Sequence, residues 1–171
     1  IWSLCPRARL LDITHEIPPH DVTAAALTLS AVVPWIPAGT ICVCVVDPGV
    51  GTSRAPLAAS ADGRFFVGPD NGVFSWVFGR AKRVTVVRLT TRRYWHSEVS
   101  STFHGRDIFA PVAAHLARGR RLHQFGPAVK RYRHLAWPPL QQAKASVRGA
   151  VIHLDRFGNA ITNVPGRLAA R

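Results

Sequence analysis

The stretch TICVCVV at residues 40–46 decides the fold class, together with the polar segment DPGVGTSR at 47–54 that follows it. The first stretch is β-branched and almost wholly apolar, which is the composition of a strand buried in a parallel sheet. A carboxylate, two glycines and an arginine come where that strand is expected to end. Ligands of open α/β sheets bind at the carboxyl ends of strands. The sequence therefore predicts a ligand site beside Asp47.

Outward from this strand, apolar strand-like runs alternate with helix-like stretches, the order that is typical of an α/β domain. We therefore expect a mostly parallel central sheet flanked by helices. The other expected strands are 10–13, 65–67, 84–89 and 150–154, and the expected helices are 24–33, 73–78 (its opening only) and 107–118. Residues 122–144 are irregular, basic and proline-bearing, so they are expected to form a connecting segment.

The composition excludes several classes of protein. With 47% hydrophobic and 18% charged residues, the 171-residue chain has the composition of a globular domain. The longest apolar run falls short of the roughly 18–20 residues that a membrane span needs, so no membrane partner is expected. The net charge of +13 is spread along the chain, and basic residues seldom alternate with aromatic ones, so no nucleic-acid partner is expected. The three cysteines suit small buried side chains in a reducing compartment, and a cytoplasmic location is expected.

Three further polar clusters accompany the one at 47–54. The segment STFHGRD at 101–107 opens the expected helix at 107–118 and brings an imidazole and an aromatic ring to its N-terminus. A group of acidic and histidine side chains lies at 12–21, and its spacing matches no zinc or iron pattern, so no metal site is expected. The last cluster is DRFGNAITN at 155–163.

Each of these clusters also has a purely structural interpretation. The segment 47–54 can be a tight turn with an aspartate cap and a surface arginine. The segment 101–107 can be a helix cap made by Thr102 or Asp107. The segment 155–163 can be a hairpin with an Asx turn. Since no phosphate-binding loop, dinucleotide fingerprint or serine nucleophile elbow is present, the residues alone indicate a ligand-binding α/β domain and no reaction.

A resemblance supplies the reaction. Five segments stand in order along nearly the whole chain: DITHEIPPHDV at 12–22, DPGVGTSR at 47–54, GPDNGVFS at 68–75, TFHGRDIFAPVAAHLARG at 102–119 and HLDRFGNAITN at 153–163. Together they resemble the S-adenosyl-L-methionine (SAM) hydroxide adenosyltransferases, which are homologous to the fluorinase and chlorinase. The resemblance implies that water attacks the ribose 5′ carbon of SAM and releases adenosine and methionine. It implies SAM as the substrate, no cofactor, and a homotrimer for the full-length protein.

The resemblance also implies roles for individual residues. Asp47, Arg54 and His104 would position and activate the attacking water, and the water proton would go to either His104 or Asp47. Asp155 would meet the amino group of the substrate, and Asn159 would meet the adenine or polar atoms near it. The remaining residues that would contact the substrate are Phe103, His20 and Asn71.

Two alternatives to the hydrolase are kept. A SAM-dependent halogenase is disfavoured, because the carboxylate of Asp47 and the neighbouring His104 suit water better than a halide ion. A non-catalytic module that binds SAM or a nucleoside is the other alternative. Because the sequence contains no methionine and ends just after a strand-like stretch, we expect a piece of a longer protein. Residues 1–171 would be its N-terminal catalytic domain, incomplete at the start, and 145–171 would lead toward a C-terminal β-barrel.

Overall fold

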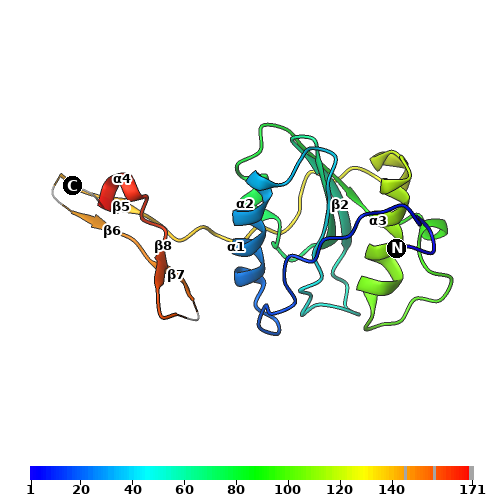
Figure 1. Ribbon diagram of the computed structural model, residues 1–171, viewed down its shortest axis with the longest axis horizontal. Helices are drawn as coiled ribbons and strands as arrows, with labels where there is room; N and C mark the ends of the chain where they lie inside the picture. The colour runs from blue at the N-terminus through cyan, green and yellow to red at the C-terminus, as the bar shows by residue number, and fades with distance from the viewer. Residues whose placement is uncertain (145, 156, 170–171) are drawn as a thin grey trace. The chain divides into compact units, whose positions relative to one another are not determined.

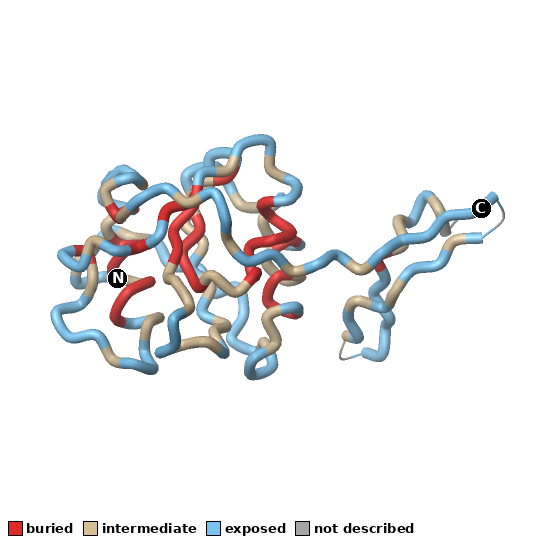
Figure 2. Tube along the Cα trace, turned by 180° about the vertical axis from the view of Figure 1, so that it is seen from behind, coloured by how far each residue is buried: buried red, intermediate tan, exposed pale blue. Residues whose placement is uncertain are grey.

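A computed structural model describes residues 1–144, 146–155 and 157–169. These residues form two compact units, 1–135 and 136–171, and each is described by itself. Buried residues concentrate in the strands and helices of the first unit (Figure 2). The first unit therefore holds the hydrophobic core, and it also holds the segments 47–54 and 101–107.

The first unit is built on a four-stranded sheet with strands in the order β1-β3-β2-β4. The strands are β1 (Ile41–Val43), β2 (Pro56–Ala61), β3 (Arg64–Pro69) and β4 (Val84–Arg88). β1 and β3 are parallel, whereas β2 runs antiparallel to both of its neighbours, β3 and β4. The expectation of a mostly parallel sheet is wrong for the described residues, although the α/β class is correct.

A tight hairpin explains the antiparallel pairing. β2 and β3 are joined by Asp62 and Gly63, whose φ angles are 44° and 81°. Two residues with positive φ make the kind of turn that closes a two-residue hairpin, and Asp-Gly is one of its preferred sequences. The Asp62 carboxylate also accepts hydrogen bonds from the backbone N–H groups of Lys82 and Arg83, directly before β4.

Helices cover both faces of this sheet (Figure 1). α1 (Val22–Val32) and α2 (Ser75–Phe78) lie on one face, and α3 (Ala110–Ala117) lies on the other. Strand residues alternate between the two cores: Ala58, Val67 and Val87 pack toward α3, and their neighbours Leu57, Ala59, Phe66 and Val86 pack with α1 and α2. This period of two is the pattern of a sheet buried on both faces.

Most expected elements are confirmed, with shifted ends. The helix expected at 24–33 is α1, followed by a short 3₁₀ turn at Val33–Trp35. The strand expected at 40–46 is limited to β1, and 10–13 has no strand structure. The helix expected at 107–118 begins instead with a π-helical turn at Gly105–Phe109 that continues into α3. Further 3₁₀ turns lie at Arg92–Tyr94 and Leu122–Phe125.

The second unit contains two small antiparallel pairs of strands. β5 (Gln141–Gln142) pairs with β6 (Val147–Arg148), and β7 (Val151–Leu154) pairs with β8 (Ala160–Thr162). A single helical turn, α4 (Gly166–Ala169), follows. The side chain of Asn163 ties this unit together, because its Oδ1 accepts from the N–H of Ala150 and its Nδ2 donates to the carbonyl of Pro138. Over the described parts of both units, each helix is too short or too polar to cross a bilayer.

Candidate active site

The segment 47–54 leaves β1 and returns an arginine to the aspartate at its start. Arg54 donates from Nε to Oδ1 of Asp47 at 3.0 Å and from Nη2 to Oδ2 of the same carboxylate. Each of the two side chains is only 5% exposed. A paired arrangement of this kind fixes the planes of both groups and is among the stronger charge-assisted contacts in proteins. The interpretation of Arg54 as a surface residue is therefore wrong.

His104 joins this pair from the other segment. Its Nδ1 lies 3.0 Å from Nη2 of Arg54. Because a guanidinium has only donors, Nδ1 must accept this bond, and a neutral His104 then carries its proton on Nε2. Burial lowers the pKa of His104, and the charge of Arg54 lowers it further, against smaller opposing effects of Asp47 and Asp107. The structure thus brings Asp47, Arg54 and His104 together in one contact chain and favours a neutral imidazole.

One nitrogen of Arg54, Nη1, takes no part in the hydrogen bonds to Asp47 and His104. Nη1 is buried and has no hydrogen-bond partner among the described residues. The guanidinium carbon lies 5.6 Å from the ring centroid of Phe109, within the range of a cation–π contact. A buried donor without a partner costs free energy unless a ligand or water accepts from it. This nitrogen is therefore an unsatisfied buried donor next to Asp47 and His104.

Two glycines allow the segment 101–107 to lie close to the chain on either side of Asp47, at Gly51 and at Val45. A Cβ on Gly51 would lie 2.5 Å from the carbonyl oxygen of Ser101, and one on Gly105 would lie 2.6 Å from Cγ1 of Val45. Both distances are shorter than any normal contact. A side chain at Gly51 would push the segments 47–54 and 101–107 apart, and one at Gly105 would push the segment 101–107 away from Val45. Gly51 also has a φ of 77°, which side-chain-bearing residues rarely adopt.

The other predicted residues of the first unit have different surroundings. Asn71 uses both ends of its amide on the backbone: Nδ2 donates to the carbonyl of Val46 at 2.8 Å, and Oδ1 accepts from the N–H of Val73. It therefore anchors the residue directly before Asp47. Phe103 is 58% exposed, with the guanidinium of Arg106 5.0 Å from its ring centroid. His20 is exposed and has a φ of 68°.

Asp155 and Asn159 lie in the second unit and contact each other. The Asp155 carboxylate accepts from the backbone N–H groups of Phe157 and Asn159 and from Nδ2 of Asn159, the last at 2.7 Å. These bonds lower the pKa of Asp155, with the Asn159 side chain contributing most. The arrangement contains the Asx turn expected as a structural alternative, and it keeps an ionised carboxylate at a partly exposed position.

The cluster of acidic and histidine residues at 12–21 is not gathered into a site. Asp12 and His15 approach each other at 3.5 Å on the surface, while the Asp21 carboxylate caps α1 by accepting from the N–H of Ala24. Over the described residues, no three His, Cys, Asp or Glu side chains lie close enough to bind a metal ion together. Cys5, Cys42 and Cys44 are free thiols, and burial raises the pKa of Cys42 to about 11.

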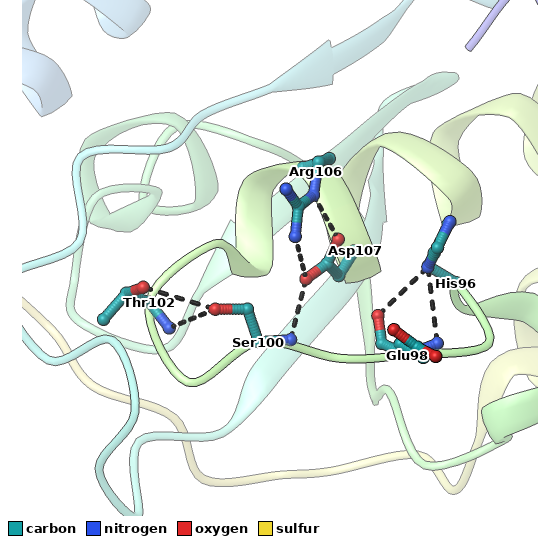
Figure 3. A network of polar contacts seen from close by, with 6 residues as sticks. All are labelled: His96, Glu98, Ser100, Thr102, Arg106 and Asp107. Carbon is teal, nitrogen blue, oxygen red and sulfur yellow. Dashed lines mark hydrogen bonds and ion pairs between the residues drawn. The ribbon is translucent and has the colours of Figure 1, made fainter.

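Sequence reasoning missed the role of Asp107. This side chain was expected at most to cap a helix, but it is fully buried and accepts from the N–H of Ser100 and from the guanidinium of Arg106 (Figure 3). A signal was available, since an aspartate on the apolar side of an amphipathic helix needs a buried partner. The expectation of a cap by Thr102 or Asp107 is wrong, because no side chain caps the π-helical turn.

Comparisons with known proteins identify the family that this chain resembles. The family model of the SAM hydroxide adenosyltransferase N-terminal domain matches residues 1–126. An (R)-S-adenosyl-L-methionine hydrolase from Salinispora tropica is 43% identical over 96% of the chain, and one from Thermus thermophilus is 40% identical over 93%. A fluorinase from Actinoplanes is more distant, at 23% identity. The chain spans 64% of the length of the two hydrolases.

A solved structure gives the same result for the fold. The crystal structure of an uncharacterized conserved protein from Thermotoga maritima matches with a TM-score of 0.92 and 37% identity, covering 98% of this chain and 64% of that one. The resemblance found in the five sequence segments is thereby confirmed, and both segments that meet at Arg54 lie within the matched residues 1–126. The chain belongs to the SAM hydroxide adenosyltransferase family, whose N-terminal domain it contains.

Proposed function

We propose that the protein that contains this chain hydrolyses SAM to adenosine and L-methionine. The observation that carries the proposal is the buried chain Asp47–Arg54–His104, in which Nη1 of Arg54 is left without a partner. That chain offers a fixed cation, an anion and a neutral imidazole to one small oxygen nucleophile. The relatives named as SAM hydrolases, at 40–43% identity, support the same reaction.

The reaction asks little of the protein beyond orientation. The water oxygen attacks the ribose 5′ carbon, the bond from that carbon to sulfur breaks, and the electron pair stays on sulfur as the neutral thioether of methionine. The positively charged sulfonium is already an activated leaving group, so correct placement of the water in line with the breaking bond is the main requirement. Nη1 of Arg54 is assigned to hold the water oxygen, and charge-assisted bonding would favour hydroxide character as it forms.

The proton of the water is assigned to Asp47. With Nδ1 of His104 accepting from Arg54, the only other ring nitrogen carries hydrogen, so neutral His104 is a donor and not a base. Each carboxylate oxygen of Asp47 keeps a free lone pair beside its bond from Arg54. His104 thus serves to orient the water or the guanidinium, and it does so in its neutral form. Because the pKa of His104 is lowered, we expect the rate to hold at the ordinary histidine pKa of about 6.5 and to fall only at lower pH, where the imidazole gains a proton.

Further residues are proposed to bind the substrate, each on the family resemblance. The ionised carboxylate of Asp155 is suited to the amino group of SAM, and Asn159 to polar atoms of the nucleoside. The exposed ring of Phe103 offers an apolar face to the nucleoside, and His20 is assigned to the pocket lining. Asn71 is assigned to the same region, where its bond to Val46 fixes the approach to Asp47. The reaction proposed here uses no cofactor.

A halogenase is the second candidate, and the structure supports it less well than a hydrolase. A halide would have to bind where the paired carboxylate of Asp47 lies, and an anion near a carboxylate is repelled. We further propose a homotrimeric full-length protein without nucleic-acid or membrane partners. A cytoplasmic location is proposed from the three free thiols, since unpaired cysteines are typical of reducing compartments.

The test is chromatographic detection of adenosine and methionine after incubation with SAM, with and without chloride. The chain is assayed as it stands and also extended with the part of the Salinispora tropica hydrolase that it does not cover. Asp47→Asn is compared with Asp62→Asn, a control that makes the same chemical change at the exposed β2–β3 turn. We expect Asp47→Asn to lower the rate at least about 10³-fold and Asp62→Asn to leave it unchanged.

Three outcomes decide between the candidates. Adenosine formation that needs Asp47 and ignores chloride supports the hydrolase. A chlorinated nucleoside in place of adenosine supports the halogenase. If the extended protein forms neither product but still binds SAM in calorimetry, the catalytic proposal fails and a binding module remains.

A further inference from the structure

A second buried carboxylate lies one helical turn beyond His104 and outside the proposed catalytic chain. The side chain of Asp107 is fully buried, whereas that of its partner Arg106 is 65% exposed. Its oxygens accept from Nε of Arg106 at 2.6 Å, from Nη2 of Arg106 at 3.1 Å and from the backbone N–H of Ser100 at 2.8 Å (Figure 3). Burying a carboxylate is costly, so all its bonds must form for the segment to keep this conformation.

The backbone of Asp107 binds the same loop at two more points. Its N–H donates to the carbonyl of Phe103 at 3.0 Å, and its carbonyl accepts from the N–H of His96 at 2.8 Å. The loop 96–103 is therefore attached to one residue at its beginning, near its middle and at its end. Further along, the hydroxyl of Ser100 accepts from the N–H of Thr102, which shapes the turn leading to His104 (Figure 3).

This loop is the surface against which the catalytic segment 47–54 packs. The carbonyl of Ser101 lies so close to Gly51 that a Cβ there would come within 2.5 Å of it. A shift of the loop would therefore move Gly51 or open a gap beside it. In either case the contact of 3.0 Å between His104 and Arg54 would change.

We propose that Asp107 is a positioning residue, whose buried carboxylate holds the loop 96–103 so that His104 meets Arg54 and Phe103 faces the substrate. Its effect on rate rests on the proposed hydrolysis, whereas its effect on His104 does not. The charged groups that act on His104 are Arg54, which lowers its pKa, and Asp47 and Asp107, which raise it. Loss of the Asp107 charge alone would lower the pKa of His104. Displacement of His104 from its buried position beside Arg54 would instead remove the two largest causes that lower this pKa, and so raise it.

The test compares Asp107→Asn with the wild type and with Asp62→Asn as the matched control. Histidine ring signals are followed by NMR across pH in the 171-residue chain, and His104 is assigned with His104→Gln. We expect His104 to titrate at higher pH in Asp107→Asn, because its buried contact with Arg54 is lost, and unchanged in Asp62→Asn. In the extended protein we expect kcat for adenosine formation to fall about 10- to 100-fold, because a displacement near 1 Å costs about that much, while KM changes less than about threefold.

The outcomes separate this proposal from the proposed function. If Asp107→Asn is folded and His104 titrates at the wild-type pH or at lower pH, the carboxylate acts at most through its charge and the positioning role is overturned, whatever the rate. If the wild type forms no adenosine, the proposed function fails, and the NMR titration still decides the role of Asp107. If Asp107→Asn does not fold, Arg106→Gln replaces it, since it removes two of the three bonds to the carboxylate and leaves the one from Ser100. A titration of His104 unchanged in Arg106→Gln would then overturn the proposal.

Discussion

The two units place their polar groups in opposite ways. In the first unit, Asp47 and Arg54 are 5% exposed, and their partner His104 comes from fifty residues further along the chain. In the second unit, Asp155 is bound by groups no more than four residues away, on an exposed turn. A site built from distant segments depends on the whole core, whereas a site built from one turn depends on that turn alone. The consequences of substitution should differ accordingly.

The largest effect is expected from Arg54→Ala in the first unit. The substitution leaves the carboxylate of Asp47 buried without its counter-ion, and breaking a buried pair in this way costs about 3–5 kcal/mol of unfolding free energy. It also removes the nitrogen assigned to the water, so adenosine formation should be lost. Urea unfolding of the 171-residue chain and the chromatographic assay measure the two effects.

Arg83→Ala is the control for that experiment, because its side chain is exposed and lies in the turn before β4. A change within about 0.5 kcal/mol is expected there. Equal stability of Arg54→Ala and Arg83→Ala would show that the pair with Asp47 does not hold the first unit together. The comparison between the two units would then lose its basis.

An intermediate effect is expected from Gly105→Ala. The new Cβ would lie 2.6 Å from Cγ1 of Val45, and overpacking of this kind costs roughly 1–3 kcal/mol. Since Gly105 follows His104 directly, the strain should also shift the imidazole and lower kcat. The second unit offers the matched control Gly166→Ala: a Cβ there meets nothing within 4 Å, and the position is in α4. Thermal unfolding and kcat should change for Gly105→Ala only, and equal changes in both variants would contradict the close approach at Val45.

Contacts within one turn could be predicted from the sequence better than contacts between distant segments. Asp47, Arg54 and His104 were predicted because their segments resemble a family. The contacts that join the three side chains could be identified only from the folded structure. The Asp62-Gly63 turn was a readable local signal, yet the strand at 56–61 before it is rich in small residues and gave no strong apolar pattern, so the antiparallel hairpin was missed. The strand expected at 10–13 failed because its Leu and Ile side chains are exposed and have no sheet to join.

Asp107 shows why the remainder needed coordinates. The sequence shows that this residue is an aspartate, but it does not show its partners. These are a backbone N–H seven residues earlier and the side chain of the adjacent arginine, whose orientation cannot be deduced from residue spacing. The same holds for Asn71, whose amide binds the carbonyl of Val46 twenty-five residues away. Long-range bonds to the backbone carry no signature in residue types, so they escape prediction even where the residue itself is recognised.

The smallest effect is expected from Asn159→Ala, and it tests the second unit most directly. The substitution removes the side-chain donor that contributes most to lowering the pKa of Asp155, so that pKa should rise toward its ordinary value. Two backbone donors to the carboxylate remain, and the turn is exposed, so the unfolding free energy should change by less than about 1 kcal/mol. If Asp155 binds the amino group of SAM, KM should rise severalfold while kcat stays near the wild-type value, because the buried chain in the first unit is untouched. A loss of kcat as large as that of Asp47→Asn would mean that Asn159 or Asp155 takes part in the chemical step, and would contradict a role in substrate binding alone.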